Sequence, residues 1–307
     1  MLVNRDDDGL PILTRLVREL VRLALAVGLP VGILLALIHV GNGFYARSGD
    51  GEARFREAAL AHFRLSHPTH DSLSISSGCC ETGLLSMELE FTAGPVAARR
   101  RDPRRDQTGE QAGGERFRFT KWTLGGMDVP YGNHWYPLDS EFSGVGNGLP
   151  HETAEERRRS RRILDRLPEG DFAAAVVELE HPLPLGDLPH TPPGAITHTL
   201  AISKSPRKPL HPPVLIPRYA DCGHEAEKDR PCPGSPFEYA RMWHDELVEQ
   251  GLWHERPGWD EALREERVYA FLVSDLRVKD LSALLKDPKV RSVRVTDTAR
   301  DLTYDGT

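Results

Sequence analysis

The sequence predicts an α+β fold, in which an N-terminal single transmembrane helix precedes an extracytoplasmic mixed α/β domain with a C-terminal β–α–β unit. Three features of the 307 residues predict this arrangement. An uncharged apolar run lies near the N-terminus, and short segments after it alternate apolar with polar residues, as strands do. Towards the C-terminus a strand, an amphipathic helix and a strand follow one another, and such a unit must rest on a sheet formed with earlier strands.

The apolar run lies in a stretch that has no Asp, Glu, Lys or Arg between Arg22 and Arg47. Its central part reads LALAVGLPVGILLALI. A helix of this length can cross a hydrocarbon core of about 30 Å, and Pro30 is tolerated inside a membrane helix. We therefore expect a cytoplasmic leader over residues 1–20 and a transmembrane helix over residues 21–45. A cleaved signal peptide is the alternative, although the leader is acidic as well as basic, unlike a short positive n-region.

The orientation of this helix is not decided by counting basic residues, because four arginines lie before the span and four lie shortly after it. A short leader is easily retained in the cytoplasm. We therefore expect the N-terminus inside and the large C-terminal domain outside. The expected location is the cell membrane, with the lipid bilayer as the partner of the N-terminal helix.

An amphipathic helix and two strands are expected after the span. Residues 52–63 place Phe55, Ala58, Ala59 and His62 on one helical face, and we expect residues 46–66 to form a juxtamembrane stalk. The extracytoplasmic domain is expected over residues 67–307. It begins with alternating segments that predict strands and a long hairpin, and the loop between them has no apolar period and is expected to be disordered. These segments are residues 84–92 and 116–124, with the loop at about 95–115.

The remaining elements follow in order. Thr153-x-x-Glu156 matches a capping box and predicts a helix that runs to about Leu167. Continuous apolar segments predict buried strands, and an amphipathic segment between them predicts a helix. These are strands at 172–179, 195–203 and 267–274 and a helix within 236–252. A helix with Val278, Leu281, Leu284 and Leu285 on one face and a strand at 289–297 complete the set.

The composition and the motifs argue against several functional classes. A net charge of −7 argues against a nucleic-acid binder. The sequence contains no G-x-S-x-G, no P-loop, no G-x-G-x-x-G and no H-E-x-x-H motif, so we expect no catalytic residue, no cofactor and no metal, and the sequence favours a non-enzymatic protein. Histidines cluster twice, and a metal site is the alternative to an exposed turn at the first cluster. The clusters are His62, His67 and His70, and His244 with His254.

The cysteines allow a disulfide. Cys222 and Cys232 flank the turn-rich segment CGHEAEKDRPC, and an oxidised pair there would contribute roughly 2–3 kcal/mol to stability. Free buried thiols are the alternative. A zinc site is disfavoured because neither pair of cysteines has the C-x-x-C spacing. Cys79 and Cys80 are adjacent, so a bridge between them would be strained.

Two runs of arginine offer a surface for an anionic partner, such as lipid headgroups or an acidic envelope polymer. The first is RRRDPRR at 99–105. The second supplies the candidate interaction residues Arg157, Arg158, Arg159, Arg161 and Arg162. The alternative is that both runs are solvated, with Glu155, Glu156 and Asp165 neutralising part of the second.

The C-terminal segment VYAFLVSDLRVKDLSALLKDPKVRSVRVTD resembles the extracytoplasmic C-terminal domain of bacterial sigma-factor regulator proteins. In that family a V-Y-G-x-V-V-T-G strand precedes a Leu-rich helix and a closing V-R-x-A-x-V strand. FAAAVVELEHPLPLGDL at 172–188 resembles the earlier strand, and the leader with one span resembles the N-terminal arrangement. The sequence departs from the pattern at Ser274-Asp275, which replaces T-G, and in its long loops.

The resemblance implies a single-pass sensor or interaction protein that regulates sigma-factor-linked envelope signalling. A leader of this length is small for holding a sigma factor alone, so another membrane or envelope protein is the expected partner. Two alternatives stay open on the sequence. One is a membrane-anchored envelope hydrolase, and the other is a structural or adaptor protein of the envelope.

Overall fold

The computed structural model describes residues 9–47, 50–75, 80–82, 86–96, 115–122, 126–130, 141–147, 152–205, 213–218, 234–253, 256 and 258–299. The chain divides into two compact units. Unit 1 comprises residues 1–56, 78–89 and 119–128, and unit 2 comprises residues 57–77, 90–118 and 129–307. The fold is mixed helix and sheet, so the α+β class is confirmed.

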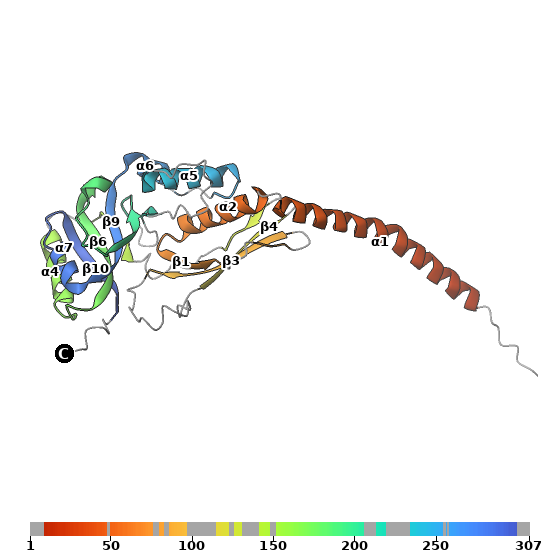
Figure 1. The fold of residues 1–307 in the computed structure, drawn as a ribbon, viewed down its shortest axis with the longest axis horizontal. Coiled ribbons are helices and arrows are strands. Elements are labelled where there is room, and N and C mark those ends of the chain that lie inside the picture. Colours follow the sequence, from red (N-terminus) through yellow and green to blue (C-terminus); the bar gives the residue numbers. More distant parts are fainter. Residues whose placement is uncertain are drawn as a thin grey trace, which may run out of the picture. The chain divides into compact units, whose positions relative to one another are not determined.

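Unit 1 contains the helix α1 (Gly9–Arg47), which Figure 1 draws in red. Within it, the 26 residues Leu16–Gly41 are long and apolar enough to cross a membrane, and none of the most apolar window is buried inside the structure. Pro30 lies inside the helix. It is the one such helix in the described part of the chain. By length and composition alone, a signal sequence near the N-terminus would meet the same test.

A first sheet has the strand order β1-β3-β4-β5, with β2 paired to β3. Its members are β1 (His70–Ile75), β2 (Glu81–Thr82), β3 (Ser86–Pro95), β4 (Glu115–Trp122) and β5 (Met127–Asp128). Alternate residues of the two long strands are buried, namely Met87, Leu89 and Phe91 in β3 and Phe117 and Phe119 in β4. The period-two pattern therefore predicted both strands and their pairing correctly. The loop expected at 95–115 lies almost wholly outside the described residues.

The helix α2 (Asp50–Ser66) covers most of residues 46–66, the segment expected to form a juxtamembrane stalk. Its C-terminal half belongs to unit 2, where Ala61 and Leu65 are part of the main hydrophobic core. The carbonyl oxygen of Leu65 also accepts a hydrogen bond of 2.9 Å from Arg256 Nη1. A free stalk would leave this apolar face in water, so the helix packs into the domain instead.

Unit 2 contains a second sheet with the strand order β10-β6-β9-β7-β8. Its strands are β6 (Phe172–Leu183), β7 (Ile196–Ala201), β8 (Leu215–Pro217), β9 (Val268–Arg277) and β10 (Val290–Ala299). β9 and β10 both run antiparallel to β6, so they are parallel to each other with β6 inserted between them. The helix α7 (Val278–Leu284) makes the crossover. The C-terminal β–α–β unit is therefore present, in a split form.

Both faces of the second sheet are covered, which accounts for the continuous apolar runs in β6 and β9. One face, with Ala175 and Val177 of β6, shares a core with buried residues of five helices. These are α2, α4 (Thr153–Leu164), α5 (Pro236–Glu249), α6 (Trp259–Glu265) and α7. Figure 1 shows α4 and α7 beside strands of this sheet. Val278, Leu281, Leu284 and Leu285 are all buried, as their shared helical face predicted.

The opposite face of the second sheet is covered by residues 141–147, of which Phe142 and Val145 are fully buried against Val176. A buried ion pair fixes this segment. Arg294 donates to Glu178 Oε2 at 2.8 Å and to the carbonyl oxygens of Glu141 and Ser143 at 2.7 and 2.8 Å.

Glu178 Oε1 in turn accepts a hydrogen bond of 3.0 Å from the backbone N–H of Gly146. Gly146 has φ +73°, and a Cβ there would lie 2.9 Å from Tyr269 Cδ1, so this position requires glycine.

The N-terminus of α4 corrects the predicted capping box. The N-cap is Glu152, which makes no side-chain capping bond. The hydroxyl of Thr153 donates to Glu180 Oε1 at 2.9 Å, and Glu156 pairs with Arg291. Thr153 and Glu156 thus pair with side chains of β6 and β10 instead of capping the helix, because polar groups on these packed strands need hydrogen-bond partners.

A reciprocal cap occurs instead at α5. Ser235 Oγ accepts a hydrogen bond of 3.2 Å from Glu238 N, and Glu238 Oε2 accepts one of 2.6 Å from Gly234 N.

Candidate functional site

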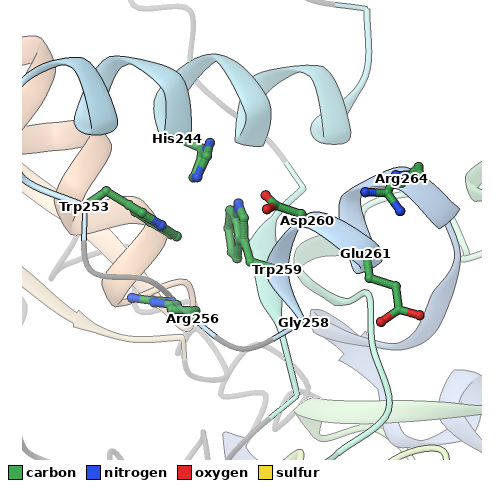
Figure 2. A pocket seen from close by; sticks show the side chains of 8 residues that line it. All are labelled: His244, Trp253, Arg256, Gly258, Trp259, Asp260, Glu261 and Arg264. Atoms are coloured by element: carbon green, nitrogen blue, oxygen red, sulfur yellow. The ribbon is translucent and has the colours of Figure 1, made fainter.

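A pocket in unit 2 lies where α5, the loop that follows it and the start of α6 meet (Figure 2). Its volume is about 380 Å³. Aromatic and charged side chains form most of its wall. The lining residues are His244, Trp253, Arg256, Gly258, Trp259, Asp260, Glu261 and Arg264.

Three aromatic rings form one wall of this tryptophan pocket. The ring centroids of Trp253 and Trp259 are 4.9 Å apart with planes inclined at 54°. His244 meets Trp253 edge-on at 4.8 Å and lies nearly parallel to Trp259 at 6.1 Å. These separations are those of favourable aromatic contacts, so the rings hold one another in place and form a pre-ordered surface.

Arg256 braces the two tryptophans from the side. Its guanidinium carbon lies 5.4 Å from the ring centre of Trp253 and 6.0 Å from that of Trp259. It also donates to the carbonyl oxygen of Leu65 at 2.9 Å. The charge of Arg256 is thus placed over both indoles by the fold itself, in a cation–π arrangement.

The indole N–H of Trp259 is the unusual polar group of the site. Trp259 is 2% exposed, and its Nε1 has no hydrogen-bond partner among the described residues. Figure 2 shows this nitrogen at the end of the ring nearest to His244 and Asp260. A buried donor without an acceptor costs about 1–3 kcal/mol. The wall of the pocket therefore includes a buried donor that no described residue satisfies.

The remaining charges of the pocket balance. Asp260 and Glu261 are acidic, Arg256 and Arg264 are basic, and His244 Nδ1 lies 3.0 Å from Asp245 Oδ1. The described lining residues include no serine, threonine, cysteine or lysine.

The second arginine run divides into two roles. Arg157, expected on an anionic-partner surface, instead donates through Nε to Val290 O at 2.8 Å and through Nη2 to Pro288 O at 2.8 Å. It is half-buried, and its side chain holds the turn before β10. Arg158, Arg159, Arg161 and Arg162 are exposed on α4, as an interaction surface requires. The first run, at 99–105, lies outside the described residues.

The histidines of the HFRLSHPTH segment are not in an exposed turn. His67 is 2% exposed, and its ring stacks on Phe63 at 4.9 Å and meets His70 at 5.6 Å and Phe117 at 5.1 Å. The turn forms where expected, but the aromatic rings of α2 and β4 close over it. Burial, then the neighbouring His70 and Arg256, lower the pKa of His67 to about 4, and burial lowers the pKa of His70 to about 4.

A hydrogen-bonded serine–histidine pair was not predicted. Ser274 Oγ and His198 Nε2 are 2.7 Å apart, across the β7–β9 pair. The register of β7 shifts at His198, and the next residue of β9, Asp275, has φ +58°. Bulges and left-handed residues are frequent near active sites. Ser274 is however 1% exposed, so the pair acts in this structure as a tie between strands. In the sequence, a hint of this pair was that Ser274-Asp275 stands where the sigma-factor regulator pattern has Thr-Gly.

The described cysteine, Cys80, is in a disulfide. Cys79, Cys222 and Cys232 lie outside the described residues, so the predicted Cys222–Cys232 bridge stays a prediction. No group of three or more His, Cys, Asp or Glu that could hold a metal ion occurs among the residues that the structure describes. His244 lies in the tryptophan pocket, whereas His254 is outside the described part.

Sequence reasoning missed the tryptophan pocket. The available signal was the segment WHERPGW at 253–259, in which two tryptophans, two charges and two turn residues occur within one loop. Amphipathic spacing does not single out such a segment, because the contacts of Trp253 and Trp259 with His244 of α5 are tertiary. Comparisons with family models, with curated proteins and with solved structures find no match to this chain.

Proposed function

We propose that this chain is a single-pass membrane protein whose extracytoplasmic α+β domain is a sensor or interaction domain. The observation that carries the proposal is the apolar segment Leu16–Gly41, whose most apolar window is not buried by any other part of the structure. In water such a surface is costly, whereas a hydrocarbon core would cover it and matches its length.

The exposed arginines of α4 support an interaction role for the domain. Arg158, Arg159, Arg161 and Arg162 present their side chains to solvent along a helix whose other face packs on β10. A row of exposed guanidinium groups suits an anionic partner, such as an acidic envelope protein or lipid headgroups. Arg161 and Arg162 also favour the helix itself, because they lie in its last turn.

The regulatory part of the proposal rests on the resemblance to sigma-factor regulator proteins. The order β9, α7 and β10 corresponds to the strand, helix and strand of that resemblance, and β6 corresponds to its earlier strand. The short leader would act through another membrane protein. Deletion of the gene in its host tests this part, since an unchanged transcriptional response to envelope stress would contradict it.

Topology is the direct test of the anchor. A reporter that is active only outside the cytoplasm, fused after Thr307 of the full chain, should be active, and the protein should stay in the membrane after alkaline carbonate extraction. The matched control fuses the same reporter to a chain that begins at Asp50. An inactive full-chain fusion at normal expression would reject the orientation, and a shortened, carbonate-soluble product would show a cleaved signal sequence.

The envelope-hydrolase alternative is favoured by one observation, the Ser274–His198 hydrogen bond. Because Ser274 is 1% exposed, we expect no labelling by a fluorophosphonate probe that reacts with activated serines. Labelling that disappears in Ser274→Ala but not in Ser203→Ala would establish the hydrolase reading and overturn this expectation.

A further inference from the structure

We propose that the tryptophan pocket is a binding site for a neutral saccharide, which it holds as a single sugar ring stacked on the indole wall. The proposal goes beyond the membrane anchor and the arginine surface and does not depend on either. It rests on the shape of the aromatic wall, on the buried Trp259 N–H and on the balance of charges around the pocket.

The aromatic wall fits a flat ring with an apolar face. Trp253 is half-buried, and its contacts with Trp259 and His244 fix its orientation before any ligand binds. A pre-ordered wall lowers the entropy cost of binding. A pyranose has such a face, formed by its axial C–H groups, and it stacks on an indole in the way that an apolar side chain does. The volume of about 380 Å³ is at the lower end of ordinary small-molecule sites and accepts one such ring.

The Trp259 N–H requires an acceptor that a sugar can provide. The nitrogen is buried and without a partner in the described chain, and it is placed on the side of His244 and Asp260 (Figure 2). A hydroxyl oxygen accepts from this N–H and, at the same time, donates its own proton to a carboxylate. Asp260 and Glu261 supply such carboxylates within the same pocket. One hydroxyl group can thus satisfy an indole donor and an acidic acceptor together.

The charges argue against the two other classes of ligand. An organic cation would be repelled by Arg256, whose guanidinium carbon lies 5.4 Å from the ring centre of Trp253. An anion such as phosphate would meet Arg264 but also Asp260 and Glu261, whose charges repel it. Among the described lining residues, two acidic side chains, Asp260 and Glu261, are matched by two basic ones, Arg256 and Arg264. A neutral ligand that both donates and accepts hydrogen bonds is the class that remains.

The test is a ligand-observed NMR titration of the full chain in lipid nanodiscs, which carry no sugar headgroups. Glucose and N-acetylglucosamine are the probes, and choline chloride and inorganic phosphate are the competing classes. We expect saturable binding of at least one sugar and none of choline or phosphate. Saturable binding of choline or phosphate, or no binding of either sugar up to molar concentration, overturns the proposal.

Two variants of the pocket sharpen the test. Trp259→Phe keeps an aromatic ring but removes the N–H donor, and Asp260→Asn keeps the shape but removes the charge. Each should weaken sugar binding about fivefold, the effect of one hydrogen bond of about 1 kcal/mol. Trp122→Phe is the matched control, because it removes an exposed indole N–H that is bonded to Asp128 in unit 1.

Each result of the variants decides the matter. If circular dichroism shows that Trp259→Phe is misfolded, the test rests on Asp260→Asn, which changes an exposed residue. Wild-type affinity in every folded pocket variant would place the sugar elsewhere and overturn the site. An equal loss in Trp122→Phe would mean that the binding is not specific to the pocket, which also overturns it.

Discussion

His67 and His70 show what burial does to single residues of this chain. Both are packed among Phe63 and Phe117, and each has a pKa lowered from 6.5 to about 4, first by burial. Arg256 and the His67–His70 pair itself add to the shift of His67. In the unfolded chain these rings would titrate near 6.5. The folded protein therefore binds fewer protons than the unfolded chain between about pH 4 and 6.5.

The first prediction is that stability rises with pH over this window. Neutral His67 contributes fully above pH 6.5, and the contribution is lost as the pH falls towards about 4, by about 3 kcal/mol for a shift of this size. Urea unfolding followed by tryptophan fluorescence at several pH values measures it. His67→Phe should flatten the dependence because its ring does not titrate, whereas a slope equal to that of the wild type would contradict the assignment.

The Glu178–Arg294 pair is the most buried charge pair of unit 2 among the described residues. The side chain of Glu178 is 2% exposed, and Ser292, Gly146 and Arg294 all donate to its carboxylate. A buried ion pair is weak evidence for stability in itself, but removal of one partner leaves an unpaired buried charge.

We predict that Arg294→Met lowers the free energy of unfolding by about 3–5 kcal/mol. It also frees the segment 141–147, whose carbonyl oxygens Arg294 binds. The double variant Arg294→Met with Glu178→Gln should recover part of this loss, because no buried charge remains. Chemical denaturation of the wild type, the two single variants and the double variant gives the coupling energy. Strictly additive losses of unfolding free energy would mean that the pair does not act as a unit.

At the scale of elements, α4 combines a structural face with a solvent face. Arg157 binds the carbonyl oxygens that precede and begin β10, whereas the other four arginines are exposed. We predict that Arg157→Gln destabilises the domain by about 1–3 kcal/mol, as buried carbonyls lose their donor.

The matched control is the set Arg158→Gln, Arg159→Gln, Arg161→Gln and Arg162→Gln, which should change the melting temperature little. The same set should lower binding to vesicles rich in phosphatidylglycerol. Unchanged binding would make these arginines a solvated face and remove them from the interaction proposal.

The helix α7 is short, yet it covers the crossover between β9 and β10. Leu281 is 0% and Leu284 5% exposed. We predict that Leu281→Ala or Leu284→Ala costs about 2–5 kcal/mol, since each leaves a cavity in the main core. Lys279→Ala on the same helix is the control. A thermal unfolding curve unchanged in both leucine variants would show that α7 does not pack as described.

At the scale of the whole molecule, the elements with a strong apolar period were predictable from the sequence. The strands β3, β4, β6, β9 and β10 and the helix α7 follow from alternation, from apolar runs and from leucine spacing. The split of the β–α–β unit was not predictable, because the pairing of β6 with both β9 and β10 joins residues far apart in sequence. The tryptophan pocket and the Ser274–His198 pair are tertiary contacts for the same reason.

A prediction for the whole chain concerns its thiols. Cys80 is in a disulfide, and the expected Cys222–Cys232 bridge leaves only the adjacent Cys79 as its partner within the chain. We therefore predict that the protein made in an oxidising compartment carries no alkylatable cysteine before reduction. Alkylation under denaturing, non-reducing conditions followed by peptide mapping tests this. The same protein expressed in a reducing cytosol is the control. Labelling of Cys222 and Cys232 in the exported protein would show free thiols and would weaken the extracytoplasmic assignment, since exported domains favour oxidation.

The insertion of β6 between β9 and β10 governs the moment at which the nascent chain can fold. β6 ends at Leu183, but its two neighbours begin only at Val268 and Val290. Until β9 has been made, the apolar run of β6 has neither neighbouring strand to pair with and is open to chaperones, and its second edge stays unpaired until β10 follows. In this architecture, the second sheet can be completed only after β10, the last of its strands to be synthesised, has been made.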